Sequence, residues 1–228
     1  MCGRFLLRCP PESWPADLFG PHPAPSILPS EDASFTPRWN IAPTQQVLAV
    51  VQRADDGHRE VRSFRWGLVP SWSHDRKIGA KMINARSETV HEKPSFRAAF
   101  ARRRCLIPAD GYYEWIKTDR GKQPMLIERE GSRAFCFAGL WEQCFHLPAE
   151  RDGQIDPQHP LTTCTILTTA ANHGMRPIHD RMPVVIDPEH YACWLDPEFD
   201  NPAALRDMLF AADEEYFTAS PVERVERV

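Results

Sequence analysis

Short strand-like segments dominate this chain and limit the folds that it can adopt. Runs rich in β-branched and aromatic residues, bounded by turn residues, are typical of strands. Nine such runs occur, at 47–53, 61–68, 81–86, 105–109, 112–117, 124–129, 134–142, 164–169 and 183–186. The segment TDRGKQ at 118–123 is typical of a hairpin turn that joins two of them. Because about nine short strands cannot form a flat sheet, we predict a mostly antiparallel curved sheet or an open β-barrel as the core.

Helical signals are fewer and lie between the strands. Segments 11–19, 94–104, 187–195 and 201–212 are predicted as short helices. In 94–104 a proline stands at the expected first turn, and Phe96, Ala99 and Phe100 share one face. The sum predicts an α+β fold with peripheral helices. Segments 20–38 and 147–160 are predicted as loops, and the lack of repeats or linkers predicts a single domain over 1–228.

Composition and charge narrow the functional classes. No stretch approaches the ~20 apolar residues of a membrane span, and the first residues do not resemble a secretory signal, so we expect a cytoplasmic protein. The seven cysteines are odd in number and form no CxxC pair, which argues against a disulfide framework or a zinc site. No cofactor or metal is indicated. The formal net charge of −4 gives no overall basic excess, so any contact with DNA must come from a local basic face.

The cysteine at position 2 has the strongest chemical signal. Met1 is followed by a small side chain, which favours removal of the initiator methionine and leaves Cys2 at the N-terminus. Such a residue carries an α-amine with a pKa of about 7.7–8.0 beside a thiol of about 8.5. The amine condenses with an aldehyde to an imine, and the thiol then closes a five-membered thiazolidine. An internal cysteine cannot do this, because its nitrogen is an amide. The bland alternative is a cysteine near a frayed chain end.

Three polar residues lie within or beside apolar strand-like runs. Asn84 lies in MINARSET, Glu114 in DGYYEWI, and His179 in PIHDRMPVVI. A polar side chain in such a run is either paired or functional. Together they offer a general acid or base (His179), a carboxylate among aromatics (Glu114) and an amide that can orient a reactant (Asn84). Each one alone could equally be a hydrogen-bonded structural residue.

Basic and aromatic residues are interleaved along the same segments. Arginines that bind phosphates and aromatics that stack on bases are the usual combination for single-stranded nucleic acid. The residues concerned are Arg4, Arg38, Trp39, Trp66, Trp72, Arg86, Trp115 and Arg181. Each tryptophan singly could instead belong to the core. The run Arg102–Arg104 lies at a predicted helix end, where the helix dipole and solvent explain it, so it indicates phosphate steering at most.

Eight motifs in order resemble one known family. They are MCGRF (1–5), RWNIAPTQ (38–45), WGLVPSW (66–72), INARSET (83–89), RRCLIPADGYYEW (103–115), FAGLWE (137–142), ILTTAAN (166–172) and IHDRMPVVI (178–186). Together they are similar to the SRAP family, the SOS-response-associated peptidases now described as abasic-site processing proteins. The resemblance is best over 1–195. PVERV at 221–225 stands where the family's closing strand is expected.

The resemblance implies a covalent capture of abasic sites in single-stranded DNA, as part of the DNA-damage (SOS) response. Met1 is removed, by the protein itself as the peptidase name of the family implies, and Cys2 forms a thiazolidine crosslink with the ring-opened sugar. The implied roles are that Asn84 holds the Cys2 backbone and the sugar, Glu114 orients the amine and moves its proton, and His179 serves as acid or base in ring opening. Weak lyase activity at the imine is a further implication. The implied DNA-binding residues are Arg4, Asn40, Trp72, Arg86, Trp115 and Arg181.

Two other functions remain open from the residues alone. One is a thiol protease that uses Cys2 and His179, and the other is a passive, non-covalent single-strand binder. Ser73 follows Trp72 where family members often carry a further aromatic, so a wedge between bases could be weaker here. We expect a monomer without membrane or metal partners, cytoplasmic and associated with the nucleoid when bound to DNA.

Overall fold

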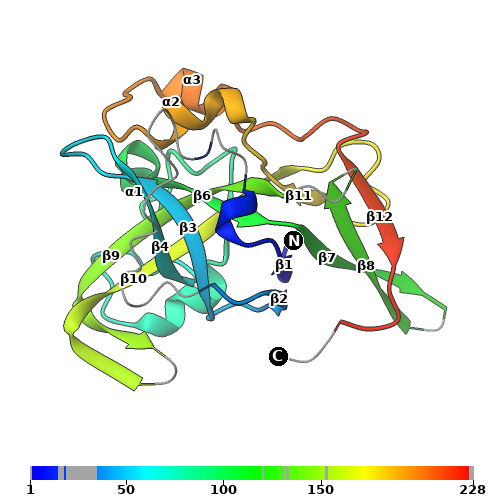
Figure 1. The fold of residues 1–228 in the computed structure, drawn as a ribbon, viewed down its shortest axis with the longest axis horizontal. Helices are drawn as coiled ribbons and strands as arrows, with labels where there is room; N and C mark the ends of the chain where they lie inside the picture. Colours follow the sequence, from blue (N-terminus) through cyan, green and yellow to red (C-terminus); the bar gives the residue numbers. More distant parts are fainter. Residues whose placement is uncertain are drawn as a thin grey trace.

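Two sheets built from twelve strands make up the fold in the computed structural model (Figure 1). It describes residues 2–14, 18, 35–119, 121–129, 131, 134–151 and 154–225. The first sheet has the order β12-β8-β7-β1-β2, and all its pairings are antiparallel. Its strands are β1 (Phe5–Leu7), β2 (Arg38–Ile41), β7 (Gly111–Thr118), β8 (Gly121–Arg129) and β12 (Phe217–Pro221).

The second sheet closes on itself. Strand β10 pairs with β4, and the path then runs through β3 and β6 to β9, which pairs with β10 again. The β4–β10 pairing is parallel, and the other pairings of this ring are antiparallel. Strands β5 and β11 flank the far end of β10. The strands are β3 (Gln46–Gln52), β4 (Arg59–Trp66), β5 (Asn84–Arg86), β6 (Arg104–Ala109), β9 (Phe135–Arg151), β10 (Gln154–Ala170) and β11 (Arg181–Pro183).

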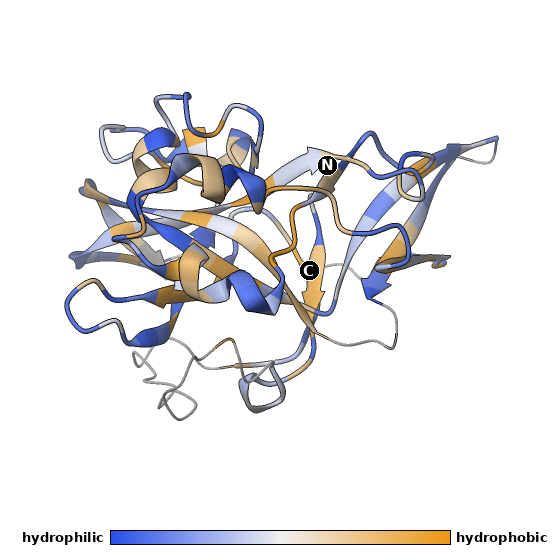
Figure 2. Cartoon of the chain, turned by 90° about the horizontal axis from the view of Figure 1, so that it is seen from above, coloured by the Kyte–Doolittle hydropathy of each residue, from blue (hydrophilic) through white to orange (hydrophobic). Residues whose placement is uncertain are grey.

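The predicted α+β class with a curved, mostly antiparallel core is thus confirmed, and the ring of strands is closed. All nine predicted strand segments overlap observed strands, but 183–186 shares only Pro183 with β11, and β9 and β10 extend far beyond 134–142 and 164–169. The predicted turn at 118–123 is the β7–β8 hairpin, in which Thr118 pairs with Gly121. Buried and partly exposed residues largely alternate along β4, whereas β6 is buried at every position, and hydrophobic and hydrophilic stretches are mixed over the sheets (Figure 2).

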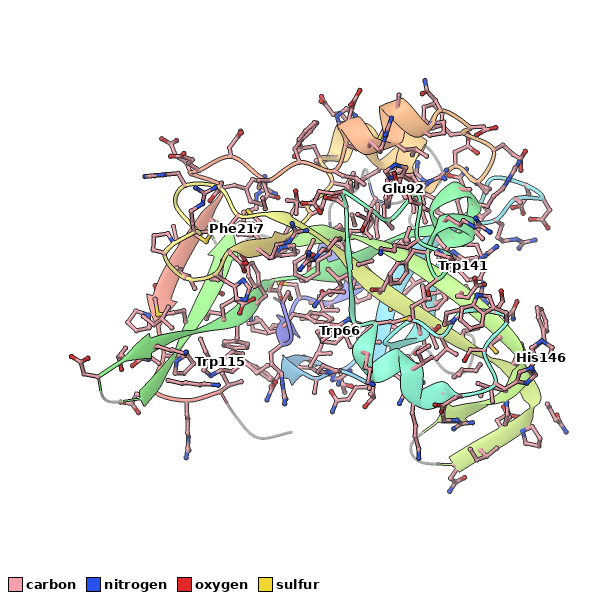
Figure 3. All side chains as sticks on the ribbon, turned by 180° about the vertical axis from the view of Figure 1, so that it is seen from behind. Trp66, Glu92, Trp115, Trp141, His146 and Phe217 are labelled. Atoms are coloured by element: carbon pink, nitrogen blue, oxygen red, sulfur yellow. The ribbon has the colours of Figure 1, made fainter. Side chains whose placement is uncertain are left out.

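Aromatic side chains pack between the two sheets. The ring of Phe5 in β1 packs edge-on against Trp66 of β4 at 5.3 Å and against Phe137 of β9 at 5.8 Å. Trp66 lies near the middle of the molecule (Figure 3). Fully burying side chains of this size contributes roughly 1.5–3 kcal/mol each. The first strand, which follows Cys2 directly, is therefore held firmly.

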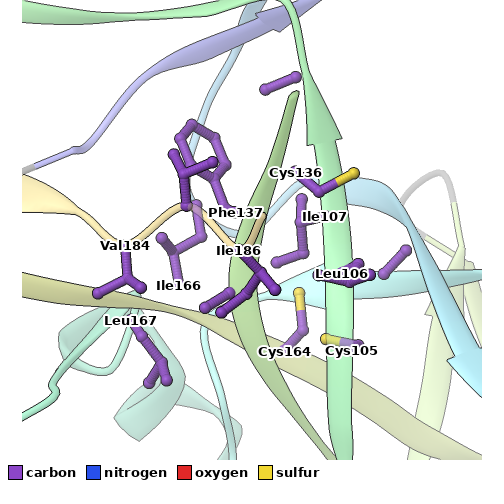
Figure 4. Close-up of a cluster of buried hydrophobic side chains, with 14 of the residues drawn as sticks. Cys105, Leu106, Ile107, Cys136, Phe137, Cys164, Ile166, Leu167, Val184 and Ile186 are labelled. Carbon is purple, nitrogen blue, oxygen red and sulfur yellow. The ribbon is translucent and has the colours of Figure 1, made fainter. Parts of the chain in front are cut away.

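Besides Cys2, three cysteines belong to the main hydrophobic cluster. Cys105, Cys136 and Cys164 pack among aliphatic side chains (Figure 4), and all three are fully or almost fully buried. Burial raises the pKa of each thiol, to about 12 for Cys136. These cysteines therefore act as small hydrophobic residues, as expected from their apolar sequence context.

Among the described residues, three short α-helices and three 3₁₀ turns lie outside the sheets. They are α1 (Arg97–Arg102), α2 (Tyr191–Leu195), α3 (Pro202–Asp207), η1 (Pro11–Ser13), η3 (Arg76–Lys81) and η5 (Pro188–His190). Helix α3 lies within the predicted segment 201–212, and the Asn201 side chain caps it by accepting from the Ala204 amide at 3.1 Å. Helix α1 begins at Arg97, not at Pro94, although Phe96, Ala99 and Phe100 do pack against the core. Within the described residues, no helix is long and apolar enough to span a membrane.

Several predicted boundaries are wrong. The loop predicted at 147–160 belongs instead to the β9–β10 hairpin, which pairs as far as Arg151 and Gln154 with register shifts near Pro148 and Pro160. These irregularities made the hairpin look like a loop. The loop predicted at 20–38 lies outside the described residues up to 34, and β2 already begins at Arg38. The closing strand is β12, which begins four residues before PVERV and ends at its first residue, Pro221. Only η1, Trp14 and Leu18 of the segment 11–19 are described.

Candidate functional site

Cys2 lies buried directly before β1, against strand β7. Strand β1 pairs with β7, with Phe5 opposite Tyr112, and the Tyr113 amide donates to the Arg4 carbonyl at 2.9 Å. The Cys2 thiol is fully buried and makes only a weak 3.9 Å contact to the Arg4 carbonyl. Burial raises the pKa of this thiol, and the nearby Glu114 carboxylate raises it further. The thiol is therefore neutral in this state.

Asn84 holds the backbone of Cys2. Its side-chain Nδ2 donates to the Cys2 carbonyl at 2.8 Å. Strand β5 places Asn84 there because it pairs in parallel with β10, where Asn84 is opposite Ile166. The Asn84 Oδ1 atom is buried and accepts no hydrogen bond from the described residues. It can therefore accept one from a ligand that reaches Cys2.

Glu114 of β7 lies near the same cysteine. Its side chain is buried, and its charge acts on both the Cys2 thiol and the Tyr112 phenol. Burial raises the pKa of Tyr112 well above its usual value, and the charges of Cys2 and Glu114 add to this effect. The structure thus brings Asn84 of β5 and Glu114 of β7 close to Cys2.

His179 approaches the site from the turn before β11. Its backbone amide donates to the Met175 carbonyl at 3.1 Å, and its Nδ1 accepts from the Arg181 amide at 3.0 Å. That contact leaves the proton of the neutral ring on Nε2. The Asp180 carboxylate lies 2.8 Å from Nδ1 and becomes its partner when the ring is protonated. Among the residues that the structure describes, no hydrogen bond joins His179 to Cys2.

Strand β10 brings the histidine to the same end of the sheet as Asn84. Thr168 of β10 is opposite Arg86 on one side, and Ala170 is opposite Arg181 on the other. The Ser87 amide and the Arg181 guanidinium both donate to the Thr168 carbonyl, at 2.8 and 2.6 Å. Strands β5 and β11 therefore carry Asn84, Arg86 and Arg181 to one edge, with His179 just before it.

Arg181 and Arg86 both act on the carboxylate of Glu88, a residue that the sequence did not indicate as a site residue. Arg181 binds Glu88 through both Nη atoms, at 2.5 and 2.9 Å. The Arg181 side chain is 12% exposed and that of Glu88 48%. This hydrogen bond lowers the pKa of Glu88, and the Arg86 charge contributes to the same effect. Arg86 itself is exposed. The nearest sequence signal for Glu88 was its place in INARSET.

Two of the predicted DNA-binding residues, Arg4 and Asn40, are hydrogen-bonded to each other. Arg4 Nη1 donates to Asn40 Oδ1 at 3.2 Å, and both side chains are half-buried. Arg38, by contrast, binds within the protein, because its Nη1 donates to the Gln46 carbonyl at 2.5 Å. Arg38 is thus a structural residue, whereas Arg4 lies two residues from Cys2.

The run Arg102–Arg104 is bound within the protein too. Arg102 pairs with Glu198 and Arg103 with Glu142, at 2.9 and 2.8 Å. Arg104 is buried and donates to backbone carbonyls of α1, of α2 and of the segment that follows α2. Phosphate steering by this run has no support in the structure.

Some of the candidate tryptophans are buried in the core, and others are exposed on the surface. Trp66 is fully buried and donates to the Ile83 carbonyl at 2.8 Å, so its place among base-stacking candidates is wrong. Trp72 is 57% exposed and Trp115 37% exposed. Ser73 is buried and cannot itself serve as a wedge.

The loop that carries Trp72 is held on both sides. Gly67 has φ +125°, and a Cβ there would lie 2.5 Å from the Gly79 carbonyl oxygen. The Val69 amide donates to Thr163 Oγ1 at 2.9 Å, and the Cys144 thiol contacts the Ser73 carbonyl at 3.2 Å. Trp72 is therefore presented from a fixed loop.

Comparison with known proteins places the chain in a defined group. A family model described as SOS response associated peptidase (SRAP) matches residues 1–228. The abasic site processing protein YoaM of Bacillus subtilis is 40% identical over 97% of this chain and 91% of its own length. YedK of Escherichia coli, which has the same description, is 31% identical over 90% of this chain and 83% of its own. The crystal structure of a phage-related protein from Bordetella bronchiseptica is 29% identical, covers 98% of this chain and 95% of its own, and has a TM-score of 0.70.

Proposed function

Because the chain belongs to the SRAP family, we propose that it captures abasic sites in single-stranded DNA by a covalent bond to Cys2, as part of the response to DNA damage. The observation that supports this most directly is the convergence of Asn84 and Glu114 on a buried Cys2. The backbone of Cys2 is held by Asn84, so its nitrogen and sulfur have a fixed relation to the pocket. Removal of Met1, by the protein itself or by a peptidase, turns that nitrogen into an amine.

The chemistry proceeds in two bond-forming steps. The amine of Cys2 attacks C1 of the ring-opened sugar, and loss of one water gives an imine. The sulfur then adds to the imine carbon, and the thiol proton ends on the nitrogen of the thiazolidine. The high pKa of the buried thiol means that it enters as S–H and needs a base nearby. Glu114 is the carboxylate in position to relay that proton.

His179 acts on the sugar rather than on the thiol. Its Nδ1 is occupied by the Arg181 amide, so the neutral ring offers an Nε2–H that can donate to the departing ring oxygen. An imine that persists would also allow strand cleavage by β-elimination. Addition of sulfur removes the imine, so we expect lyase activity to be weak.

The charges of the site suit a single strand. Arg4, Arg86 and Arg181 surround the pocket and supply contacts to phosphates, which fix the register of the strand without reading its bases. An unpaired strand can turn its lesion into the pocket without the cost of opening a duplex. We therefore propose binding that is independent of sequence and sensitive to salt.

A thiol protease is less well supported. Such an enzyme needs a thiolate, usually stabilised by a neighbouring histidine that lowers the thiol pKa. Here burial and a carboxylate raise the pKa of Cys2. The pocket is therefore better suited to a neutral thiol that reacts after the amine.

The test is a denaturing gel with an oligonucleotide that contains one abasic site. The processed wild-type protein should give a shifted band, and Cys2→Ser should not. Cys193→Ser, at a partly buried cysteine in helix α2, is the matched control and should crosslink normally. Crosslinking by Cys2→Ser at the wild-type rate would overturn the proposal.

A further inference from the structure

A second aromatic side chain stands out on the sheet that carries Cys2. Trp39 in β2 is 52% exposed, although it lies within a strand next to β1. The sequence indicates it as one of several aromatic residues that could stack on bases, and the proposed function gives it no role. We propose that Trp39 is a stacking platform for an unpaired base of the strand whose lesion occupies the Cys2 pocket. This inference rests on the proposed function and adds a binding residue to it.

A bulge in β2 determines where Trp39 points. Phe5 pairs with Ile41 and Leu7 with Arg38, so two steps along β1 correspond to three steps along β2. The extra residue makes Trp39 and Asn40 together oppose Leu6. A bulge of this kind re-aims side chains, and here it brings two adjacent residues toward the same face.

Hydrogen bonds identify that face. Asn40 Oδ1 accepts from Arg4, and Arg4 is opposite Tyr113 in β7, whose amide donates to its carbonyl. The Tyr113 hydroxyl crosses β1 and donates to the Trp39 carbonyl at 3.0 Å. Side chains that oppose each other across a strand pair lie on one face of the sheet. Asn40, Arg4 and Tyr113 thus share a face, and Trp115, two residues after Tyr113, shares it too.

Burial distinguishes this face from the core face. Phe5, Leu7 and Tyr112 belong to the main hydrophobic cluster, whereas Leu6 and Tyr113 are buried outside it. The outer face therefore has its own thin apolar layer, from which two large aromatic rings, Trp39 and Trp115, extend into solvent. Arg4 lies on the same face, between β2 and β7.

This combination fits a nucleobase better than another protein. A guanidinium between two exposed indoles supplies a phosphate contact with a stacking surface on either side, which is the recipe for single strands. The face lies close to the reactive site along the chain, because Arg4 is two residues from Cys2 and Tyr113 is next to Glu114, whose side chain points to the other face of β7. Leu6 is four residues from Cys2, which is roughly 13 Å along an extended chain. Trp39 therefore meets a base a few nucleotides from the lesion.

The test measures equilibrium binding to a single strand that carries a non-reactive tetrahydrofuran abasic analogue. Trp39→Ala should weaken binding by roughly 5- to 100-fold, the range for loss of one base–aromatic stack. Trp39→Phe should restore most of the affinity. The matched control is Phe145→Ala, which removes another exposed aromatic ring. Phe145 precedes His146, which lies at the opposite end of the molecule from Trp115 (Figure 3).

A base-resolved readout separates stacking from general destabilisation. With 2-aminopurine placed one to five nucleotides to either side of the analogue, wild type should quench its fluorescence at one position or two adjacent positions. Trp39→Ala should lose that quenching only there. The fold should survive, because the Trp39 carbonyl that Tyr113 binds belongs to the backbone.

Two outcomes are distinguishable from failure of the proposed function. If wild type captures a reactive abasic strand but Trp39→Ala binds within twofold of Phe145→Ala, the platform is wrong and the capture stands. If wild type captures nothing while Trp39→Ala still loses single-strand affinity, the platform stands and the covalent function is wrong.

Discussion

Glu88 should act as an internal competitor for the phosphate that Arg181 binds. Its carboxylate occupies both Nη atoms of Arg181, at 2.5 and 2.9 Å. A half-exposed ion pair contributes about 0.2–1 kcal/mol, and this bidentate geometry favours the upper end. Glu88→Gln should therefore tighten non-covalent binding to single-stranded DNA by about two- to fivefold. It should also steepen the slope of log K against log salt by about 0.7, because one net positive charge is gained.

Fluorescence anisotropy at several salt concentrations, with the tetrahydrofuran strand, measures both quantities. Glu198→Gln is the control, since it breaks a surface pair with Arg102 on the helical side of the molecule. The pKa of Glu88 is lowered, so the pair's stabilisation is present above about pH 4.3 and lost as the pH falls through the folded-state pKa. At neutral pH the competition is therefore complete. Weaker binding by Glu88→Gln would refute the reasoning and show that Glu88 positions Arg181 for DNA.

Four further outcomes are expected. Cys2→Ala should abolish crosslinking yet retain non-covalent affinity within about twofold, by gel and anisotropy; loss of both would contradict the separation of binding from capture. His179→Ala should slow crosslinking in a quenched time course without lowering the melting temperature by more than a few degrees, and a melted fold would mean that this histidine is structural. Arg104→Met should lower the free energy of unfolding in urea by about 3–5 kcal/mol, because the backbone carbonyls that accept from its guanidinium lose their donor. Arg103→Met is the control, since Arg103 forms a less buried ion pair, and a smaller loss for Arg104→Met than for Arg103→Met would contradict this reasoning. The free energy of unfolding should fall by about 2 kcal/mol per buried thiol between pH 8 and pH 10, because unfolded thiols ionise above about pH 8.5 while the folded ones keep their protons. The thiols concerned are Cys2, Cys105, Cys136 and Cys164, and a flat profile would contradict their raised pKa values.

The strands with strong side-chain patterns could be predicted from the sequence, and the short ones could not. Strands β1 and β2 have three and four residues, and tertiary pairing makes them strands rather than propensity, since β1 pairs with β7 and β2 pairs with β1. The β9–β10 hairpin was mistaken for a loop because prolines interrupt its ladder at register shifts. Prolines at irregular or edge positions are compatible with a sheet, which local patterns do not reveal.

Some residues of the candidate site could likewise be predicted from the sequence, and others could not. Asn84 and Glu114 were identifiable because each is a polar residue within an apolar strand, and the structure places both against Cys2. The ion pair between Arg181 and Glu88 could not be identified from the sequence, because the two residues are 93 positions apart and are brought together only by the pairing of β5 and β11 with β10. The exposure of Trp39 was equally hidden, since it depends on one extra residue in the β2 ladder.

The central claim is that a terminal amine and the adjacent sulfur act on one sugar carbon, and the mass of the crosslinked product tests it most directly. Intact and tandem mass spectrometry should find the oligonucleotide on residue 2 alone, in a chain that lacks Met1, at the sum of the two masses minus one water. A variant with an alanine inserted before Cys2 should form no adduct. An adduct on that variant, or on a chain that keeps Met1, would contradict the account.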